Sequence, residues 1–187
     1  MENDICRELV KKAIDGDTAA FEEIYRLTSG FVFNVALRIA RRHADAEDIT
    51  QEVFVKTHKN LRQFGFQSSL KTWLYRITVN TALSRCRKNT GAANAMAKYK
   101  NHLATEPTFI PFPDPVHKKD NESIVAALLA KLDPDQRVCV VLREMEGFTY
   151  DEIAEILNVP MNTVRSRLHR AREALMEFAK KEALNTW

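Results

Sequence analysis

Residues 148–181 read FTYDEIAEILNVPMNTVRSRLHRAREALMEFAKK, and this stretch decides how the rest of the chain is interpreted. Thr149 precedes Glu152 by three residues, which is the pattern of a capping box at the start of a helix. That helix ends at Pro160, because proline has no amide hydrogen and disfavours the α conformation of the residue before it. A second helix is expected to begin between Pro160 and Asn162. The stretch therefore predicts a short helix, a tight turn and a longer helix.

The second helix of this stretch has one apolar side and one basic side. Its apolar residues recur every three or four positions and form one stripe: Val164, Leu168, Ala171, Leu175 and Phe178. The opposite face carries the residues that we expect to contact DNA: Arg165, Ser166, His169 and Arg170. Arg167 lies nearer the apolar edge, where it would reach a phosphate or an acidic neighbour. This layout is typical of a helix-turn-helix that reads a DNA major groove, and the alternative is a helical hairpin with a solvated basic face.

The composition of the whole chain limits the class of protein. Its 187 residues suffice for one domain or two small ones, and 45% hydrophobic content suits a globular protein. The sequence has neither a long apolar run nor a signal-peptide pattern, which predicts a cytoplasmic protein without membrane insertion. The cysteines Cys6, Cys86 and Cys139 are far apart and form no CxxC pair, so we expect a reducing compartment and no zinc site. The net charge of +3 is too small to identify a partner.

The sequence lacks the motifs of the common catalytic sites. It contains no GxxxxGK(S/T) phosphate loop, no GxSxG elbow and no HExxH pair. The acidic residues between Asp45 and Glu52 are compatible with a metal site, but no Glu-x-x-His pair accompanies them. We therefore expect a protein that is not an enzyme and that needs no metal or cofactor.

The N-terminal half is predicted to be a row of helices. Asp17 is expected to cap a long helix that runs to about Arg41, and a second long helix follows over residues 44–61. One side of the helix 44–61 carries an acidic strip that includes a glutamine: Asp45, Asp48, Gln51 and Glu52. This strip either balances the helix dipole or binds a basic helical partner, and the residues alone leave both interpretations open.

The next helix, over residues 70–88, is apolar on two sides. It is therefore predicted to lie centrally, with other helices packed on both sides. Between the apolar sides runs a strip that combines an aromatic ring with polar and basic groups: Trp73, Arg76, Asn80 and Arg87. This strip suits nucleic acid, although a solvated edge explains it nearly as well. In the preceding loop, Phe64 and Phe66 are expected either to join the core or to be displayed for stacking on bases.

Residues 89–119 are predicted to be a linker. Helical periodicity fades there, and residues 105–118 hold four of the six prolines, which favours an extended connector. Beyond it, Asp133 and Pro134 are expected to start a helix that runs to Glu146. The sequence therefore predicts an all-α protein of two small helical domains, residues 1–88 and 120–187, joined by a flexible proline-rich linker.

Three blocks of the sequence resemble one protein family in their order and content. They are DAEDITQEVFVKTHKNL (45–61), FQSSLKTWLYRITVNTALSRCRK (66–88) and LDPDQRVCVVLREMEGFTYDEIAEILNVPMNTVRSRLHRARE (132–173). Together they are similar to the extracytoplasmic-function (ECF) sigma factors, the minimal two-domain members of the sigma-70 family. His58 and Ser84 depart from the family, which more often has tryptophan and aspartate there.

The resemblance implies a bacterial protein that binds core RNA polymerase, directs it to promoters and helps to open them. It implies that the acidic strip docks on the clamp helices of the β′ subunit, that the C-terminal domain meets the β flap, and that an anti-sigma factor holds the protein inactive. The helix from about residue 162 would read the −35 element. The loop 62–69 and the helix after it would capture the −10 element through these candidates: Phe64, Gln67, Ser68, Trp73, Arg76 and Asn80.

The expected linker is long enough for both domains to reach their promoter elements. About 30 residues span at most roughly 100 Å, and two elements ~25 base pairs apart are separated by about 85 Å. Two other classes of protein are compatible with the residues. One is a dimeric helix-turn-helix regulator that reads a palindrome without polymerase. The other is a helical adaptor that binds a protein through residues 20–88.

Overall fold

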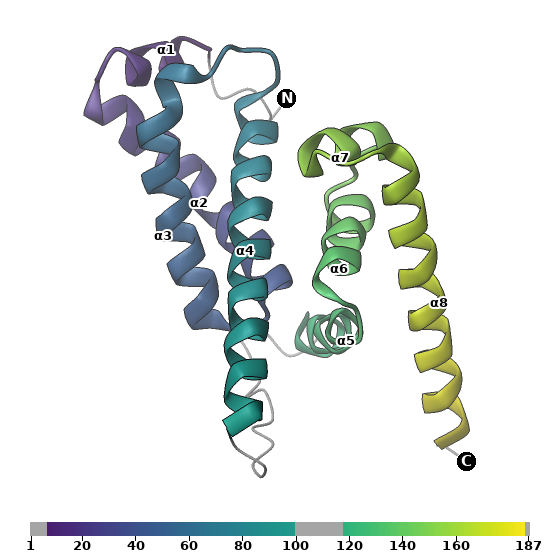
Figure 1. The fold of residues 1–187 in the computed structure, drawn as a ribbon. Helices are drawn as coiled ribbons and strands as arrows, with labels where there is room; N and C mark the ends of the chain where they lie inside the picture. The colour runs from purple at the N-terminus through teal and green to yellow at the C-terminus, as the bar shows by residue number, and fades with distance from the viewer. Residues whose placement is uncertain (1–6, 100–117, 186–187) are drawn as a thin grey trace.

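The structure, a computed structural model, describes residues 7–99 and 118–185, and its regular elements in these ranges are all helical (Figure 1). The N-terminal half comprises α1 (Arg7–Ile14), α2 (Thr18–Ala40), α3 (His43–Asn60), the 3-10 turn η1 (Leu61–Gln63) and α4 (Leu70–Tyr99). The C-terminal half comprises α5 (Lys118–Ala130), α6 (Pro134–Val140), the π-helical turn η2 (Val141–Met145), α7 (Tyr150–Leu157) and α8 (Met161–Asn185). No helix in the described ranges is long and apolar enough to cross a membrane. The all-α prediction is confirmed.

The long helix α2 begins and continues as its sequence predicts. The carboxylate of Asp17 accepts hydrogen bonds from the amides of Ala19 and Ala20, at 2.9 and 3.1 Å, and so caps the helix. The helix passes through Gly30 without a break. Arg41 closes it in the left-handed conformation, with φ of 67°, which is uncommon for a residue other than glycine.

Helix α4 lies between two groups of helices. α2 and α3 pack on one side of it, and α6 and α7 pack on the other (Figure 1). Its apolar residues Leu74, Tyr75 and Val79 are accordingly buried, which confirms the predicted central position. The helix continues to Tyr99, so residues 89–99 of the predicted linker are helical. The proline-rich remainder, residues 100–117, lies outside the described residues.

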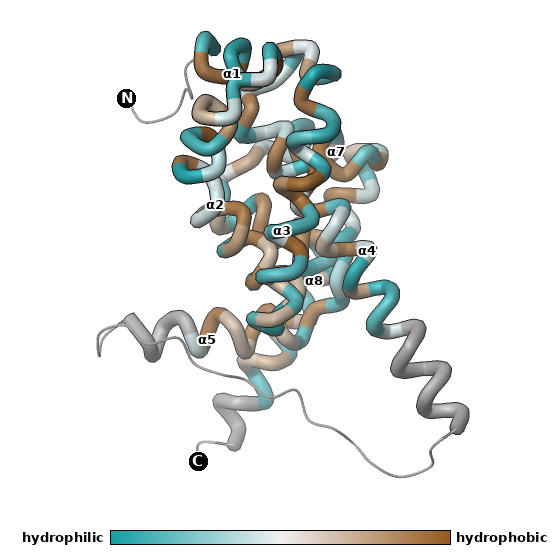
Figure 2. Tube along the Cα trace, turned by 90° about the vertical axis from the view of Figure 1, so that its left-hand side faces the viewer, coloured by the Kyte–Doolittle hydropathy of each residue, from teal (hydrophilic) through white to brown (hydrophobic). Residues whose placement is uncertain are grey.

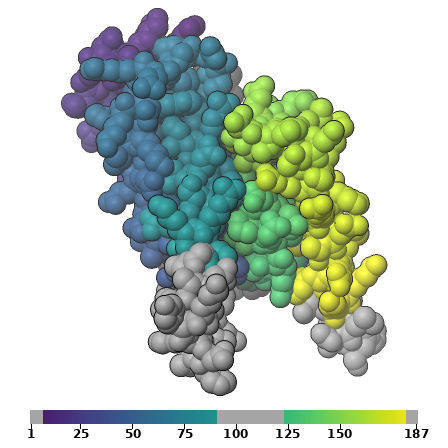
Figure 3. Space-filling view, viewed as in Figure 1, coloured from purple at the N-terminus to yellow at the C-terminus, as the bar shows by residue number. Residues whose placement is uncertain are grey.

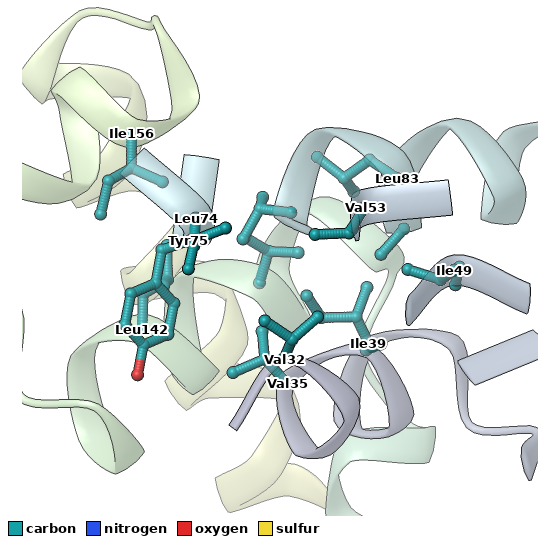
Figure 4. Packing of buried hydrophobic residues seen from close by; sticks show 14 of the residues in the cluster. Val32, Val35, Ile39, Ile49, Val53, Leu74, Tyr75, Leu83, Leu142 and Ile156 are labelled. Carbon is teal, nitrogen blue, oxygen red and sulfur yellow. The ribbon is translucent and has the colours of Figure 1, made fainter. Parts of the chain in front are cut away.

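One hydrophobic cluster joins the two halves of the protein. Apolar and polar residues alternate at helical spacing along α2, α3 and α4 (Figure 2), and the apolar ones meet in a common core. This core contains Tyr75 of α4, Leu142 of η2 and Ile156 of α7, so both halves contribute to it (Figure 4). A smaller cluster fills the C-terminal half alone: Leu129, Leu132, Val141 and Ala171. The halves therefore share packing.

The helix-turn-helix has the predicted construction. The amide of Glu152 donates to the hydroxyl of Thr149 at 3.3 Å, and the amide of Thr149 donates to the carboxylate of Glu152 at 2.8 Å, so the capping box is complete. Asn158 ends α7 in the left-handed conformation, with φ of 51°. Helix α8 then begins at Met161, within the predicted interval.

The helix predicted over residues 134–146 changes its form part of the way along. Asp133 accepts from the amide of Gln136 at 2.9 Å and caps α6 as expected. From Val141 the chain adopts the wider π-helical turn, and the segment ends before Gly147, whose φ of 78° suits glycine. This wider turn was not predicted from the apolar spacing, because a local change of hydrogen-bond ladder leaves no mark in the residue pattern.

Candidate nucleic-acid and partner interfaces

The four residues expected to read duplex DNA are all exposed, and they stand on one face of α8, which we call the reading face: Arg165, Ser166, His169 and Arg170. Neighbours on the same helix orient three of them. Arg165 lies 3.5 Å from the side-chain oxygen of Asn162. The hydroxyl of Ser166 donates to the Thr163 carbonyl at 3.0 Å, and His169 lies 3.4 Å from Glu173. The reading face is therefore an ordered, polar and mainly basic surface.

The opposite side of α8 anchors the reading face. Val164, Leu168 and Ala171 are buried, and α8 packs on α6 and α7. At the edge, Arg167 pairs with Asp135 of α6 at 3.0 Å. This is the acidic neighbour proposed for Arg167 from its place near the apolar stripe. A rigid support of this kind fixes the direction in which the exposed side chains project.

The aromatic loop before α4 is packed rather than displayed. Phe64 is buried, and its ring lies 4.9 Å from that of Phe66 and 5.3 Å from that of Trp73. Of the two alternatives that the sequence left open, the structure places Phe64 in the core. Arg7 covers the ring of Phe66 at 4.8 Å. The loop is thus held from beneath by aromatic rings that pack at a tilt to one another.

Polar groups of this loop and of α4 remain at the surface. Gln67, Ser68, Arg76 and Asn80 are exposed, and Trp73 is half-buried. Ser69 fixes the start of α4, because its hydroxyl accepts from the amide of Thr72 at 3.0 Å. The set predicted to bind single-stranded DNA therefore divides into surface residues and the buried Phe64, which supports them.

The acidic strip of α3 is likewise partly exposed and partly buried. Asp48, Gln51 and Glu52 are exposed, whereas Asp45 is buried, accepting a hydrogen bond from Asn89 of α4 at 3.2 Å. Basic residues already face the exposed carboxylates: Arg85 lies 3.3 Å from Asp48, and Lys56 lies 2.7 Å from Glu52. The bond to Lys56 lowers the pKa of Glu52. A basic partner would have to compete with these two side chains.

The sequence did not predict a group of polar contacts between the two halves. Glu146, at the end of η2, receives the hydroxyl of Tyr75 on one carboxylate oxygen and the guanidinium of Arg38 on the other, the latter at 2.8 Å. The ring of Phe148 packs edge-on against Tyr75, with centroids 4.9 Å apart. Burial, followed by the bond to Glu146, raises the pKa of Tyr75. We call Arg38, Tyr75 and Glu146 the Glu146 latch.

A buried arginine is the second contact that the sequence did not reveal. Arg137 of α6 is only 6% exposed, yet none of its hydrogen bonds given by the structure goes to a carboxylate. Its guanidinium donates to the carbonyl of Leu129 in α5 and to that of Leu132 in the turn after it, each at 2.8 Å, and to that of Ile39 in α2. Burial lowers its pKa to about 10, so it stays charged at neutral pH.

Two family models match the chain, one in each half. The model of sigma-70 region 2 matches residues 24–91, which include the acidic strip and the candidate residues of the loop and α4. The model of sigma-70 region 4 matches residues 123–175, which include the reading face. The matched ranges thus contain all three candidate surfaces.

Curated relatives match over most of their own length. The RNA polymerase sigma-H factor of Pseudomonas aeruginosa is 32% identical over 178 residues, which cover 90% of this chain and 91% of that protein. The ECF RNA polymerase sigma-E factor of Escherichia coli strain K12 is 33% identical over 175 residues, which cover 89% and 90% of the two chains.

Solved structures share the fold. The sigma factor RpoE of Bartonella quintana, solved in complex with the anti-sigma factor NepR, has a TM-score of 0.67 at 26% identity, covering 86% of this chain and 96% of that chain. CnrH, solved with the cytosolic domain of CnrY, has a TM-score of 0.64 at 22% identity, covering 94% and 97%. The second likeness concerns the fold alone.

Proposed function

This chain belongs to the sigma-70 family, among its extracytoplasmic-function members, and from that premise we propose which of its three surfaces bind the −35 element, the −10 element and core polymerase. As a sigma factor, it is a bacterial transcription initiation factor that binds core RNA polymerase, directs it to promoters with −35 and −10 elements and assists promoter melting. The relatives support this interpretation and not the dimeric regulator. Because polymerase works in the cytoplasm, we place the chain there.

The observation that carries the proposal is the reading face of α8. Its polar side chains project from a helix whose other side is fixed in a helix-turn-helix, which is the geometry that lets a helix enter a major groove. Arg165 and Arg170 can each bind a guanine through two hydrogen bonds, and the shorter Ser166 and His169 can contact neighbouring bases or phosphates. We assign this face to the −35 element.

The loop before α4 and the exposed strip of α4 are assigned to the −10 element. Half-buried Trp73 offers a ring edge for an unstacked base, and Arg76 and Asn80 continue the strip one and two turns further along. Gln67 and Ser68 extend the polar surface onto the loop. Buried Phe64 lies beneath and keeps the loop in shape for a single strand.

The exposed part of the acidic strip is assigned to core polymerase. Asp48, Gln51 and Glu52 present two carboxylates and an amide to a helical partner, which in this family is the β′ clamp. Asp45 does not contact the partner itself. It is buried, and its hydrogen bond from Asn89 joins α3 to α4 and so holds the strip in place. The C-terminal half would contact the β flap.

An anti-sigma factor is the expected inhibitor of this chain. The Bartonella relative was solved with such a partner. We propose that the inhibitor covers the surface of α3 and α4 together with the reading face of α8. Binding both surfaces through one tethered chain raises the effective concentration of the second contact, so modest contacts add up to tight inhibition.

Reconstituted transcription tests the assignment. The purified chain is added to core polymerase that lacks any sigma factor, with a library of genomic promoter fragments as template, and the transcripts are sequenced. We expect transcripts whose start sites share a −35 and a −10 motif upstream. A chain that produces no more transcript than core polymerase alone, and does not co-purify with it, would contradict the proposed function.

A further inference from the structure

Helix α4 differs from the rest of the chain in its charge. Over 30 residues it carries six lysines and arginines and no aspartate or glutamate, although the whole chain has 25 acidic residues among 187. The helix also reaches the molecular surface beside the C-terminal half, as the space-filling view shows in teal (Figure 3). Its exposed side therefore suits an anionic partner.

The surface strip of α4 that is assigned to the −10 element continues beyond Asn80. From Arg76 the strip advances in steps of four, four and three residues to Asn80, Ser84 and Arg87, and residues at these spacings are neighbours on one helix face. Ser84 is exposed, and the side chain of Arg87 is 66% exposed. We call Ser84 and Arg87 the strip end. The −10 assignment leaves these two side chains without a role.

We propose that the strip end binds the phosphate backbone of the duplex immediately upstream of the −10 element. This inference rests on the proposed function, because the −10 assignment fixes the direction of the DNA. The loop before α4 and Trp73 are assigned to unstacked bases at the start of the helix. From the far end of α4 the chain leads to the half that carries the −35 reading face. That end therefore points upstream, where the two DNA strands are paired.

The length of the strip fits this placement. Asn80 and Arg87 are seven residues apart, which corresponds to about 10 Å along an α-helix. Base pairs rise roughly 3.4 Å each, so this distance spans about three base pairs. With Asn80 at the upstream edge of the −10 element, Arg87 lies beside paired DNA. Arginine and serine both donate hydrogen bonds to phosphate oxygens, and such contacts position a protein on DNA without reading its sequence.

An anionic oxygen already lies against Arg87 in the structure. One carboxylate oxygen of Asp135 in α6 is 3.4 Å from the Arg87 guanidinium and 3.0 Å from that of Arg167. A phosphate oxygen has the same acceptor character and can take the place of this carboxylate on Arg87. The alternative is that Arg87 serves only this ion pair, and the experiment has to separate the two roles.

Two DNA probes test the proposal with holoenzyme formed from core polymerase and the full-length chain. Their −10 sequence is taken from the reconstituted transcripts. One probe is the single strand that carries the −10 element. The other adds one helical turn of duplex, about ten base pairs, on the upstream side and has no −35 element. Titrations followed by fluorescence anisotropy give the affinity for each probe.

Four variants are compared with the wild type. Arg87→Ala removes the cation, and Ser84→Asp places a carboxylate where the phosphates would lie. Lys88→Ala is the matched control, because it removes one charge from the same helix on the side of α3, where Lys88, after Lys56 and Arg85, helps to lower the pKa of Glu52. Asp135→Asn weakens the ion pair of Arg87 and leaves the strip end unchanged.

We expect the wild type to bind the probe with duplex more tightly than the single strand. Arg87→Ala and Ser84→Asp should each weaken binding to the probe with duplex by about tenfold, as loss of one charge-assisted contact implies. Both should bind the single strand as the wild type does. For Arg87→Ala, the log–log dependence of affinity on salt should also lose about 0.9 of its slope. Lys88→Ala and Asp135→Asn should match the wild type on both probes.

Several results would overturn the proposal. Arg87→Ala could bind the probe with duplex as tightly as the wild type, or Lys88→Ala could lose as much, which would indicate general charge. The same loss in Asp135→Asn would assign Arg87 to the ion pair alone. A loss for Arg87→Ala that changes with the sequence of the added duplex would exclude a phosphate contact. A wild-type holoenzyme that does not bind the single strand would instead contradict the proposed function.

Discussion

Replacement of Arg137 by methionine should destabilise the fold more than any exposed arginine change. The substitution keeps a long side chain but removes the donors to the carbonyls of Leu129, Leu132 and Ile39, which are then left in a buried site. Bonds from a charged donor contribute about 1.5–3 kcal/mol each, and relief from burying the charge offsets part of the loss. We expect a net loss of ~3 kcal/mol, because three buried carbonyls lose their charged donor.

Urea unfolding followed by circular dichroism measures this loss. With a slope of about 2 kcal/mol per molar urea, the midpoint should fall by roughly 1.5 M. Arg137→Lys keeps the charge but not the fork of donors, so it should give a smaller fall in the same direction. Arg26→Met is the matched control, since Arg26 makes an ion pair with Glu23 at 2.6 Å on the exposed surface and should give no measurable change. A midpoint for Arg137→Met equal to that of the wild type would refute the role given to the buried guanidinium.

The other predictions concern single surfaces. Arg165→Ala should cost about 1–3 kcal/mol at specific −35 sites, and an equal loss on random duplex DNA in a binding titration would show that Arg165 contacts phosphate instead. Asp48→Lys should abolish co-purification with core polymerase while its circular dichroism spectrum is kept, whereas Glu47→Lys, on the same helix but off the acidic strip, should still co-purify. Thr149→Ala should destabilise the C-terminal half by about 1 kcal/mol through loss of the cap. Hydrogen bonds from the amide and the hydroxyl of Thr149 lower the pKa of Glu152 from its usual 4.5, and alanine keeps only the amide bond. The part of this difference that depends on the Glu152 carboxylate should therefore be present above that pH and be lost in thermal melts as the pH falls through the lowered value.

Features set by a few neighbouring residues could be predicted from the sequence. The caps at Asp17, Asp133 and Thr149 were predicted in this way, because each depends on a side chain and an amide no more than three positions apart. The central place of α4 was also predicted, because a helix that is apolar on two sides must be covered on both.

Features set by the pairing of distant segments could not be predicted. Tyr75 and Glu146 are 71 positions apart, and neither the tyrosine nor the glutamate signals the other in the sequence. Arg137 is in a stretch of helix where an arginine would ordinarily be taken as exposed, and only the meeting of α5, α2 and α6 buries it. Asp45 fits the acidic strip by spacing, but the long α4 brings Asn89 against it.

The shared core also affects how readily the chain aggregates when no partner is bound. A chain that opens presents the apolar side of α4, with Tyr75 at its centre, and the matching surface around Leu142 and Phe148. Contiguous exposed apolar surfaces of this kind drive aggregation. Because the two halves pack together, this apolar surface is buried and is not available for aggregation. The contacts between the halves thus also protect the chain from aggregation.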